Sequence, residues 1–133
     1  MATVENVRLA ITDSATKPGY SDIAYSYELH PSELDCEWKR EYTVRTNLWG
    51  EDMLDDDILV CDKDEHKIRF DDAGPCEPMQ VSRVFEVETK LLDEDMFGDD
   101  EVYLMVEAST GLGSDAAGED PVMGRSNTVV GDF

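Results

Sequence analysis

Carboxylates at alternate positions, with a glycine among them, occur in "DEDMFGDD", residues 93–100. Asp93, Asp95 and Gly98 fit positions 1, 3 and 6 of the twelve-residue helix–loop–helix calcium loop. Position 5 would be Phe97 and position 12 would be Leu104, and neither side chain carries an oxygen. The sequence therefore excludes that motif.

A different calcium geometry remains open to the same residues. Calcium-dependent phospholipid-binding domains are β-sandwiches with a loop similar to "DEDMFGDD", in which acidic residues from two neighbouring loops share the ion. The second loop would be "DKDEH" or "EDMLDDD". Alternatively, Asp and Gly are simply turn formers that cluster by chance among 32 acidic residues. Calcium is the one cofactor that the sequence suggests, and its candidate ligands are Asp93, Asp95, Asp99, Asp62 and Asp64.

The sequence offers little for catalysis. It has two histidines, His30 at a strand end before Pro31 and His66 in a charged segment. No Ser or Cys lies in a nucleophile-elbow context such as GxSxG. We expect no enzyme and assign no catalytic residue.

One tryptophan is a candidate for binding a partner. Trp49 has the parity opposite to Trp38 and is expected to face outward, near the acidic loop at 51–57. An exposed Trp beside carboxylates suits a partner's aromatic or basic group, so the candidate partner-binding residues are Trp49, Asp55, Asp56 and Asp57. The alternative is that Trp49 packs under its own loop. Four other aromatic residues are expected in the core: Trp38, Tyr42, Phe85 and Tyr103.

The elements that position these residues are strands, because apolar residues recur with period two almost throughout. "DKDEH" predicts a hairpin between two short strands, and "PSEL" predicts one helical turn. Seven or eight short strands predict an all-β fold, an antiparallel two-sheet sandwich in one domain over 1–133. The expected strands cover 7–11, 23–29, 36–48, 58–61, 67–70, 81–91, 102–108 and 126–133.

The C-terminal third, "VFEVETKLL…EVYLMVEASTGLG…GRSNTVV", resembles the end of a fibronectin type III domain, mainly over residues 84–130. The matching positions are Leu92, Tyr103, Val106, Ala108, Gly113, Ser126 and Asn127. An acidic insertion stretches the Leu-to-Tyr interval, and Tyr25 and Tyr27 stand where the family has a Trp on the second strand. The resemblance implies an immunoglobulin-like sandwich and a role in adhesion or docking without catalysis.

The net charge is −21, and no Lys or Arg occurs between Lys90 and Arg125. Such a field repels nucleic acid and anionic membranes and attracts cations and basic proteins. The other interpretation is solubility or adaptation to a salty cytoplasm. The sequence has neither a secretion leader nor an apolar run near 18 residues, so no membrane span is expected.

The three cysteines, Cys36, Cys61 and Cys76, are odd in number and lack CxxC spacing. This argues against a disulfide framework and against a zinc ribbon. A Cys36–Cys61 bridge remains open, but reduced thiols in a cytoplasmic protein are the expectation.

These observations favour a non-catalytic protein-interaction or structural module that presents acidic loops to a basic protein partner. The first alternative is a calcium-binding sandwich with the ion held between acidic loops. The second is an acidic mimic of nucleic acid that blocks a basic protein. The oligomeric state and the partner's identity do not follow from the sequence.

Overall fold

The computed structural model describes residues 2–37, 39–51, 56–61, 64–70, 76–93, 100–110, 121–131 and 133, and only the backbone of Asp57. Within these ranges the chain forms nine strand segments, one short α-helix and one 3-10 turn. No helix in them has the length and apolar character that crossing a membrane requires. In chain order the elements are β1 (Thr3–Asp13), β2 (Tyr20–His30), α1 (Glu33–Glu37), β3 (Glu41–Gly50), β4 (Asp57–Cys61), β5 (His66–Arg69), β6 (Met79–Glu88), η1 (Thr89–Leu91), β7 (Asp100–Thr110), β8 (Val122–Arg125) and β9 (Val129–Gly131).

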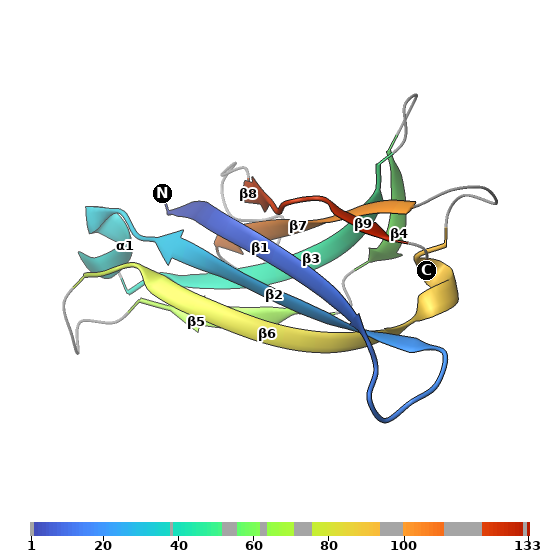
Figure 1. Ribbon diagram of the computed structural model, residues 1–133. Coiled ribbons are helices and arrows are strands. Elements are labelled where there is room, and N and C mark those ends of the chain that lie inside the picture. The colour runs from blue at the N-terminus through green and yellow to red at the C-terminus, as the bar shows by residue number, and fades with distance from the viewer. Residues whose placement is uncertain are drawn as a thin grey trace.

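The strands form two antiparallel sheets packed face to face (Figure 1). The smaller sheet has the order β1-β2-β6. In the larger sheet, β3 and β7 are the central strands, with β4 and β5 beside β3, and β8 and β9 beside β7. The predicted all-β, antiparallel two-sheet sandwich is confirmed.

The predicted hairpin between β4 and β5 is wrong. Both segments pair antiparallel with β3, where Gly50 is opposite Asp57 and Glu41 is opposite Arg69. β4 and β5 therefore run in the same direction along β3 and are two parts of one interrupted strand. A polar run of this composition interrupts a strand as readily as it reverses one, and the pairing with β3 decides between the two.

The last strand is interrupted in the same way. β8 and β9 both pair with β7, with Met105 opposite Arg125 and Val102 opposite Val129. Ser126 lies in the break, where its Oγ accepts from the Leu104 N–H at 2.8 Å and its own N–H donates to the Leu104 carbonyl at 2.9 Å. This hydrogen bonding keeps the break attached to β7.

The core lies between the sheets and follows the predicted alternation closely. In β2, every second residue from Ser21 to Leu29 is buried. Tyr42, expected in the core, is fully buried, and Phe85 packs against the core from β6. The side chains that are almost completely removed from water include Ile23, Tyr27, Leu29, Tyr42, Val44, Leu48, Leu92, Val102, Leu104 and Val106.

The third strand begins later than predicted, because residues 33–37 form helix α1 and β3 starts at Glu41. Ser32 and Asp35 form a reciprocal cap: the Ser32 N–H donates to Asp35 Oδ2 at 2.7 Å, and the Asp35 N–H contacts Ser32 Oγ at 3.3 Å. A Ser followed three residues later by an acidic residue is a helix-start signal. This local signal outweighs the alternation that extended the strand to Cys36. Trp38, a predicted core residue, lies outside the described residues.

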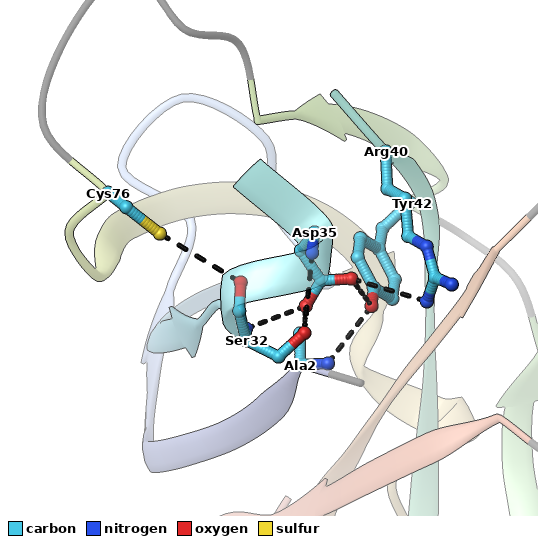
Figure 2. Close-up of polar contacts among 6 residues, drawn as sticks. All are labelled: Ala2, Ser32, Asp35, Arg40, Tyr42 and Cys76. Atoms are coloured by element: carbon cyan, nitrogen blue, oxygen red, sulfur yellow. Dashed lines mark hydrogen bonds and ion pairs between the residues drawn. The ribbon is translucent and has the colours of Figure 1, made fainter. Parts of the chain in front are cut away.

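Asp35 also joins three parts of the chain (Figure 2). The Tyr42 hydroxyl donates to Asp35 Oδ1 at 2.7 Å and accepts from the Ala2 N–H at 3.0 Å. Arg40 approaches the same carboxylate at 3.5 Å. Burial acts to raise the pKa of Asp35, but the hydrogen bonds from Ser32 and Tyr42 outweigh it and leave the pKa below its ordinary value. This buried carboxylate links α1, β3 and, through Tyr42, Ala2 just before β1.

A disulfide joins Cys36 to Cys76, with the Cα atoms 5.8 Å apart, and Cys61 is free and exposed. The expectation of reduced thiols is therefore wrong, and so is the alternative Cys36–Cys61 pair. Cys36 lies on α1 and not on a strand facing β4, and it meets the segment before β6 instead. Cys76 Sγ also contacts the Ser32 carbonyl at 3.9 Å (Figure 2); a disulfide sulfur has no hydrogen to donate, so this is a packing contact.

Candidate interaction face

Asp64, one of the predicted calcium ligands, holds the two sheets together. It lies between β4 and β5 and receives two hydrogen bonds from Arg83 of β6, at 2.6 and 2.9 Å. The Tyr25 hydroxyl of β2 donates to the same carboxylate at 2.6 Å. The hydrogen bond from Arg83 holds the pKa of Asp64 below its ordinary value. Asp64 is thus an ion-pair partner, with little of its oxygen surface left for a metal.

His66 continues this inter-sheet cluster. Its Nε2 lies 2.5 Å from the Tyr27 hydroxyl, whereas its buried Nδ1 has no hydrogen-bond partner of good geometry among the described residues. Burial lowers the pKa of His66, and the nearby Arg83 guanidinium lowers it further. The other histidine, His30, contacts Glu5 and Glu28 at 3.1 and 2.9 Å. Neither ring is hydrogen-bonded to a Ser or Cys within the described ranges, as activation of a nucleophile would require.

The remaining predicted calcium ligands are only partly visible. Asp93 is exposed at the end of the 3-10 turn region. Asp62, Asp95 and Asp99 lie outside the described residues. The described residues contain no group of three or more His, Cys, Asp or Glu side chains arranged to hold a metal. The calcium site stays a prediction from sequence.

Two aromatic rings lie nearly parallel on the outer face of the larger sheet. Trp49 of β3 and Tyr103 of β7 are directly opposite in register, while their neighbours Leu48 and Leu104 face the core. The rings are nearly parallel, 7° apart, with centroids separated by 6.4 Å. Such a pair contributes about 0.5–1.5 kcal/mol beyond burial. Trp49 faces outward as predicted, whereas Tyr103, predicted in the core, is buried on the opposite side of the sheet.

A cation completes this stack. The Arg125 guanidinium of β8 lies 3.6 Å from the centre of the Tyr103 ring, a geometry worth about 0.5–2 kcal/mol depending on exposure. Glu51 holds Arg125 at 3.1 Å and accepts from Thr128 Oγ1 at 3.1 Å. We call Trp49, Tyr103 and Arg125 the aromatic–arginine stack.

Asp56 anchors the other side of the stack. The Tyr103 hydroxyl donates to Asp56 Oδ2 at 2.7 Å. Burial and this carboxylate together raise the pKa of Tyr103 to about 12, so the phenol stays protonated and donates at neutral pH. Trp49 is partly buried, and its buried Nε1 has no hydrogen-bond partner in the described part of the chain. The side chains of the stack are therefore held in one arrangement before any partner arrives.

Exposed apolar side chains flank the stack. Ile58 of β4 is opposite Trp49 and is 48 % exposed, and Met123 of β8 is 55 % exposed. We define the interaction face as these two residues together with the aromatic–arginine stack, bordered by Glu51 and Asp56. It has a rigid aromatic centre, an apolar margin and an acidic rim, an arrangement typical of protein docking surfaces.

Only some of the predicted partner-binding residues lie at this face. Trp49 belongs to it and Asp56 borders it, Asp55 lies outside the described residues, and Asp57 is described only as backbone in β4. Sequence reasoning missed Tyr103 and Arg125. For Tyr103 a signal existed, because the parity that places Val102 and Leu104 inward places Tyr103 outward. No such signal existed for Arg125. A long connection separates β7 from β8, so the sequence does not fix which residues of the two strands are opposite each other.

Comparison with protein-family models and with curated protein sequences finds no match to this chain.

Proposed function

We propose that this chain is a non-catalytic protein-interaction module that binds a partner with a basic surface through the interaction face. The observation that carries the proposal is the aromatic–arginine stack, three large side chains fixed outside the core on one sheet face. None of the three belongs to the core cluster between the sheets. Pre-ordered aromatic and arginine side chains lower the entropy lost on binding.

Charge supports a basic partner. The chain carries −21, and Glu51 and Asp56 lie at the rim of the interaction face, where complementary charge speeds association and selects partners. The single cation of the face, Arg125, is already paired with Glu51. A basic partner therefore meets a surface whose net field is attractive.

The strand order supports an immunoglobulin-like fold of the fibronectin type III kind. In a constant-type immunoglobulin domain the first, second, fifth and fourth strands face the third, sixth and seventh. With each interrupted strand counted once, this chain has the first, second and fifth strands (β1, β2, β6) facing the third, sixth and seventh (β3, β7, β8–β9). The fourth (β4–β5) pairs with the third. Folds of this type host docking and adhesion functions, although fold alone is weak warrant for function.

Selection from a displayed random peptide library tests the proposal, because the peptides that bind reveal the chemistry of the partner. We expect enriched peptides to be rich in Lys or Arg with an apolar residue, and to lose at least tenfold in affinity for the Ile58→Ser/Met123→Ser variant. The control is Leu34→Ser/Leu91→Ser, which removes two exposed apolar side chains, 45 % and 44 % exposed, on α1 and η1. Equal binding to the native protein and to the Ile58/Met123 variant would contradict the proposal.

The two alternatives have weaker support. A calcium-binding sandwich needs ligands other than Asp64, which is bonded to Arg83 and Tyr25. A nucleic-acid mimic needs a regular array of carboxylates, and the aromatic–arginine stack contributes nothing to such an array. A cytoplasmic location rests on composition alone, and the disulfide favours an oxidising compartment.

A further inference from the structure

The sandwich is closed along one side. The Asn127 side chain accepts from the Leu9 N–H at 2.8 Å and donates to the Leu9 carbonyl at 3.1 Å, which joins β1 to the break between β8 and β9. Gly124 lies against β1 so closely that an added Cβ would be 2.7 Å from Val4 and 2.9 Å from Val7. The edge of β1 is therefore occupied by the chain's own larger sheet.

The opposite side presents β6 as an edge strand. It pairs only with β2 in the smaller sheet, and within the described residues no backbone hydrogen bond reaches it along its other edge. In Figure 1, β6 is the outermost strand of the front sheet. An unpaired edge of this kind is a template for another strand.

β6 lacks the usual features that block strand addition. Its ten residues pair with β2 in one unbroken register, without a bulge, and they contain no proline. Its one inward-facing charge, Arg83, is neutralised by Asp64. Inward charges, bulges and prolines are devices that protect natural edges, and in β6 the only one present is Arg83, whose charge Asp64 neutralises.

Val84 is an exposed apolar residue beside the free edge of β6. It lies on the outer face in the middle of β6 and is 65 % exposed, the highest fraction among the large exposed apolar side chains described. Its register partner on β2 is Ala24, whose methyl group is too small to cover it. A strand added to the free edge would place a side chain directly beside Val84.

We propose that β6 is a homodimerisation edge, to which the β6 of a second copy adds antiparallel with the two Val84 side chains opposite each other. The two sheets would join into one of six strands. The proposal is independent of the interaction face, which lies on the other sheet.

The sequence of β6 selects this register. Antiparallel partners directly opposite share a face, so a symmetric pairing is centred on a residue. Centring on Arg83 places two guanidinium groups opposite each other, which is unfavourable. Centring on Phe85 pairs fewer residues of the strand. Centring on Val84 pairs residues 80–88 with no like charges opposite, since Ser82 meets Glu86, Gln80 meets Glu88 and Arg83 meets Phe85.

The charge of the molecule sets the conditions for association. Two copies at −21 repel each other, and this repulsion is screened as the Debye length falls from about 8 Å at 0.15 M salt to about 3 Å at 1 M. We therefore expect the dimer fraction to rise with sodium chloride.

Sedimentation velocity on the native chain and on charge variants of Val84 tests the proposal. In 1 M salt we expect a species of twice the 14.9 kDa chain mass for the native protein, and monomers for Val84→Glu and Val84→Lys. An equimolar mixture of the two variants is expected to recover the dimer, because Glu and Lys then face each other. This recovery also shows that both variants are folded.

The matched control is Val130→Glu, which charges a 59 % exposed valine on β9 of the other sheet and should leave the dimer intact. A native protein that stays monomeric in 1 M salt would overturn the proposal. So would a dimer that survives in Val84→Glu and Val84→Lys alone, or one that Val130→Glu abolishes instead.

Discussion

At the scale of single residues, two carboxylates connect parts of the chain that are separate in the sequence. Asp64 joins β6 to the break between β4 and β5, and Asp35 joins α1 to β3 and, through Tyr42, to Ala2 just before β1. A buried polar group without a partner costs about 1–3 kcal/mol. The hydrogen bonds of these carboxylates therefore contribute to folding.

The buried titratable groups predict that the free energy of unfolding decreases in two stages as the pH is lowered. His66 has a folded pKa below its ordinary 6.5, so the unfolded chain binds a proton there first and stability declines as pH drops below 6.5. Asp64 and Asp35 have folded pKa values below 3.8. Their contribution is present above 3.8 and is lost as pH falls through the folded pKa. Urea unfolding at successive pH values measures both stages.

Replacing His66 should remove the first stage. The His66→Gln variant should lose little stability between pH 7 and pH 5, whereas the native protein should decline over this range. A native protein equally stable at pH 7 and pH 5 would be inconsistent with a buried, neutral His66.

At the scale of elements, the recurrence of apolar residues at every second position was enough to predict most strands and the faces that they turn inward. Ile23 to Leu29 alternate as expected, and Trp49 faces outward because Leu48 faces inward. The predictions failed where a local signal overrides the alternation and where contacts distant in sequence decide. The Ser32–Asp35 cap and the left-handed backbone of Lys39, with φ of 52°, end the alternation before β3. The direction of the chain after β4 depends on pairing with β3, and the position of Arg125 over Tyr103 depends on the register of β8 against β7.

The disulfide should contribute strongly to stability, because it closes a loop of 40 residues. Restricting the unfolded chain in this way typically contributes about 2–4 kcal/mol. Reduction, or the Cys36→Ala/Cys76→Ala variant, should lower the free energy of unfolding by that amount in urea titrations.

Cys61→Ser is the control for this change, since the Cys61 thiol is free and exposed, and it should leave stability unchanged. Thiol titration of the denatured, unreduced protein should count one thiol per chain. Three thiols in protein that was purified without reductant would contradict the disulfide.

Asn127 should hold β1 to the larger sheet. Its side chain makes two hydrogen bonds with the Leu9 backbone, so Asn127→Ala should cost about 1–3 kcal/mol by leaving these groups unpaired. Hydrogen exchange provides a local readout: the Leu9 amide should be protected in the native protein and exchange faster in the variant. Thr128→Ala, which removes a neighbouring bond to Glu51 on the outer face, should leave the Leu9 amide protected.

At the scale of the whole molecule, a charge of −21 acts on folding as well as on binding. Self-repulsion destabilises the compact state, and salt relieves it. The melting temperature should therefore rise as sodium chloride increases to about 0.15 M, where the Debye length is already about 8 Å. A further strong rise beyond 1 M would indicate adaptation to a salty cytoplasm, and a melting temperature independent of salt would contradict self-repulsion.

The central claim is that binding is localised on the interaction face and is not a diffuse attraction to an acidic surface. Nuclear magnetic resonance of the isotope-labelled protein, titrated with a library-selected basic peptide, tests this most directly. We expect the Trp49 indole resonance and the amides of β3, β7 and β8 around it to shift, while those of β1, β2 and β6 stay in place. Shifts distributed over both sheets, or confined to the smaller sheet, would contradict the claim.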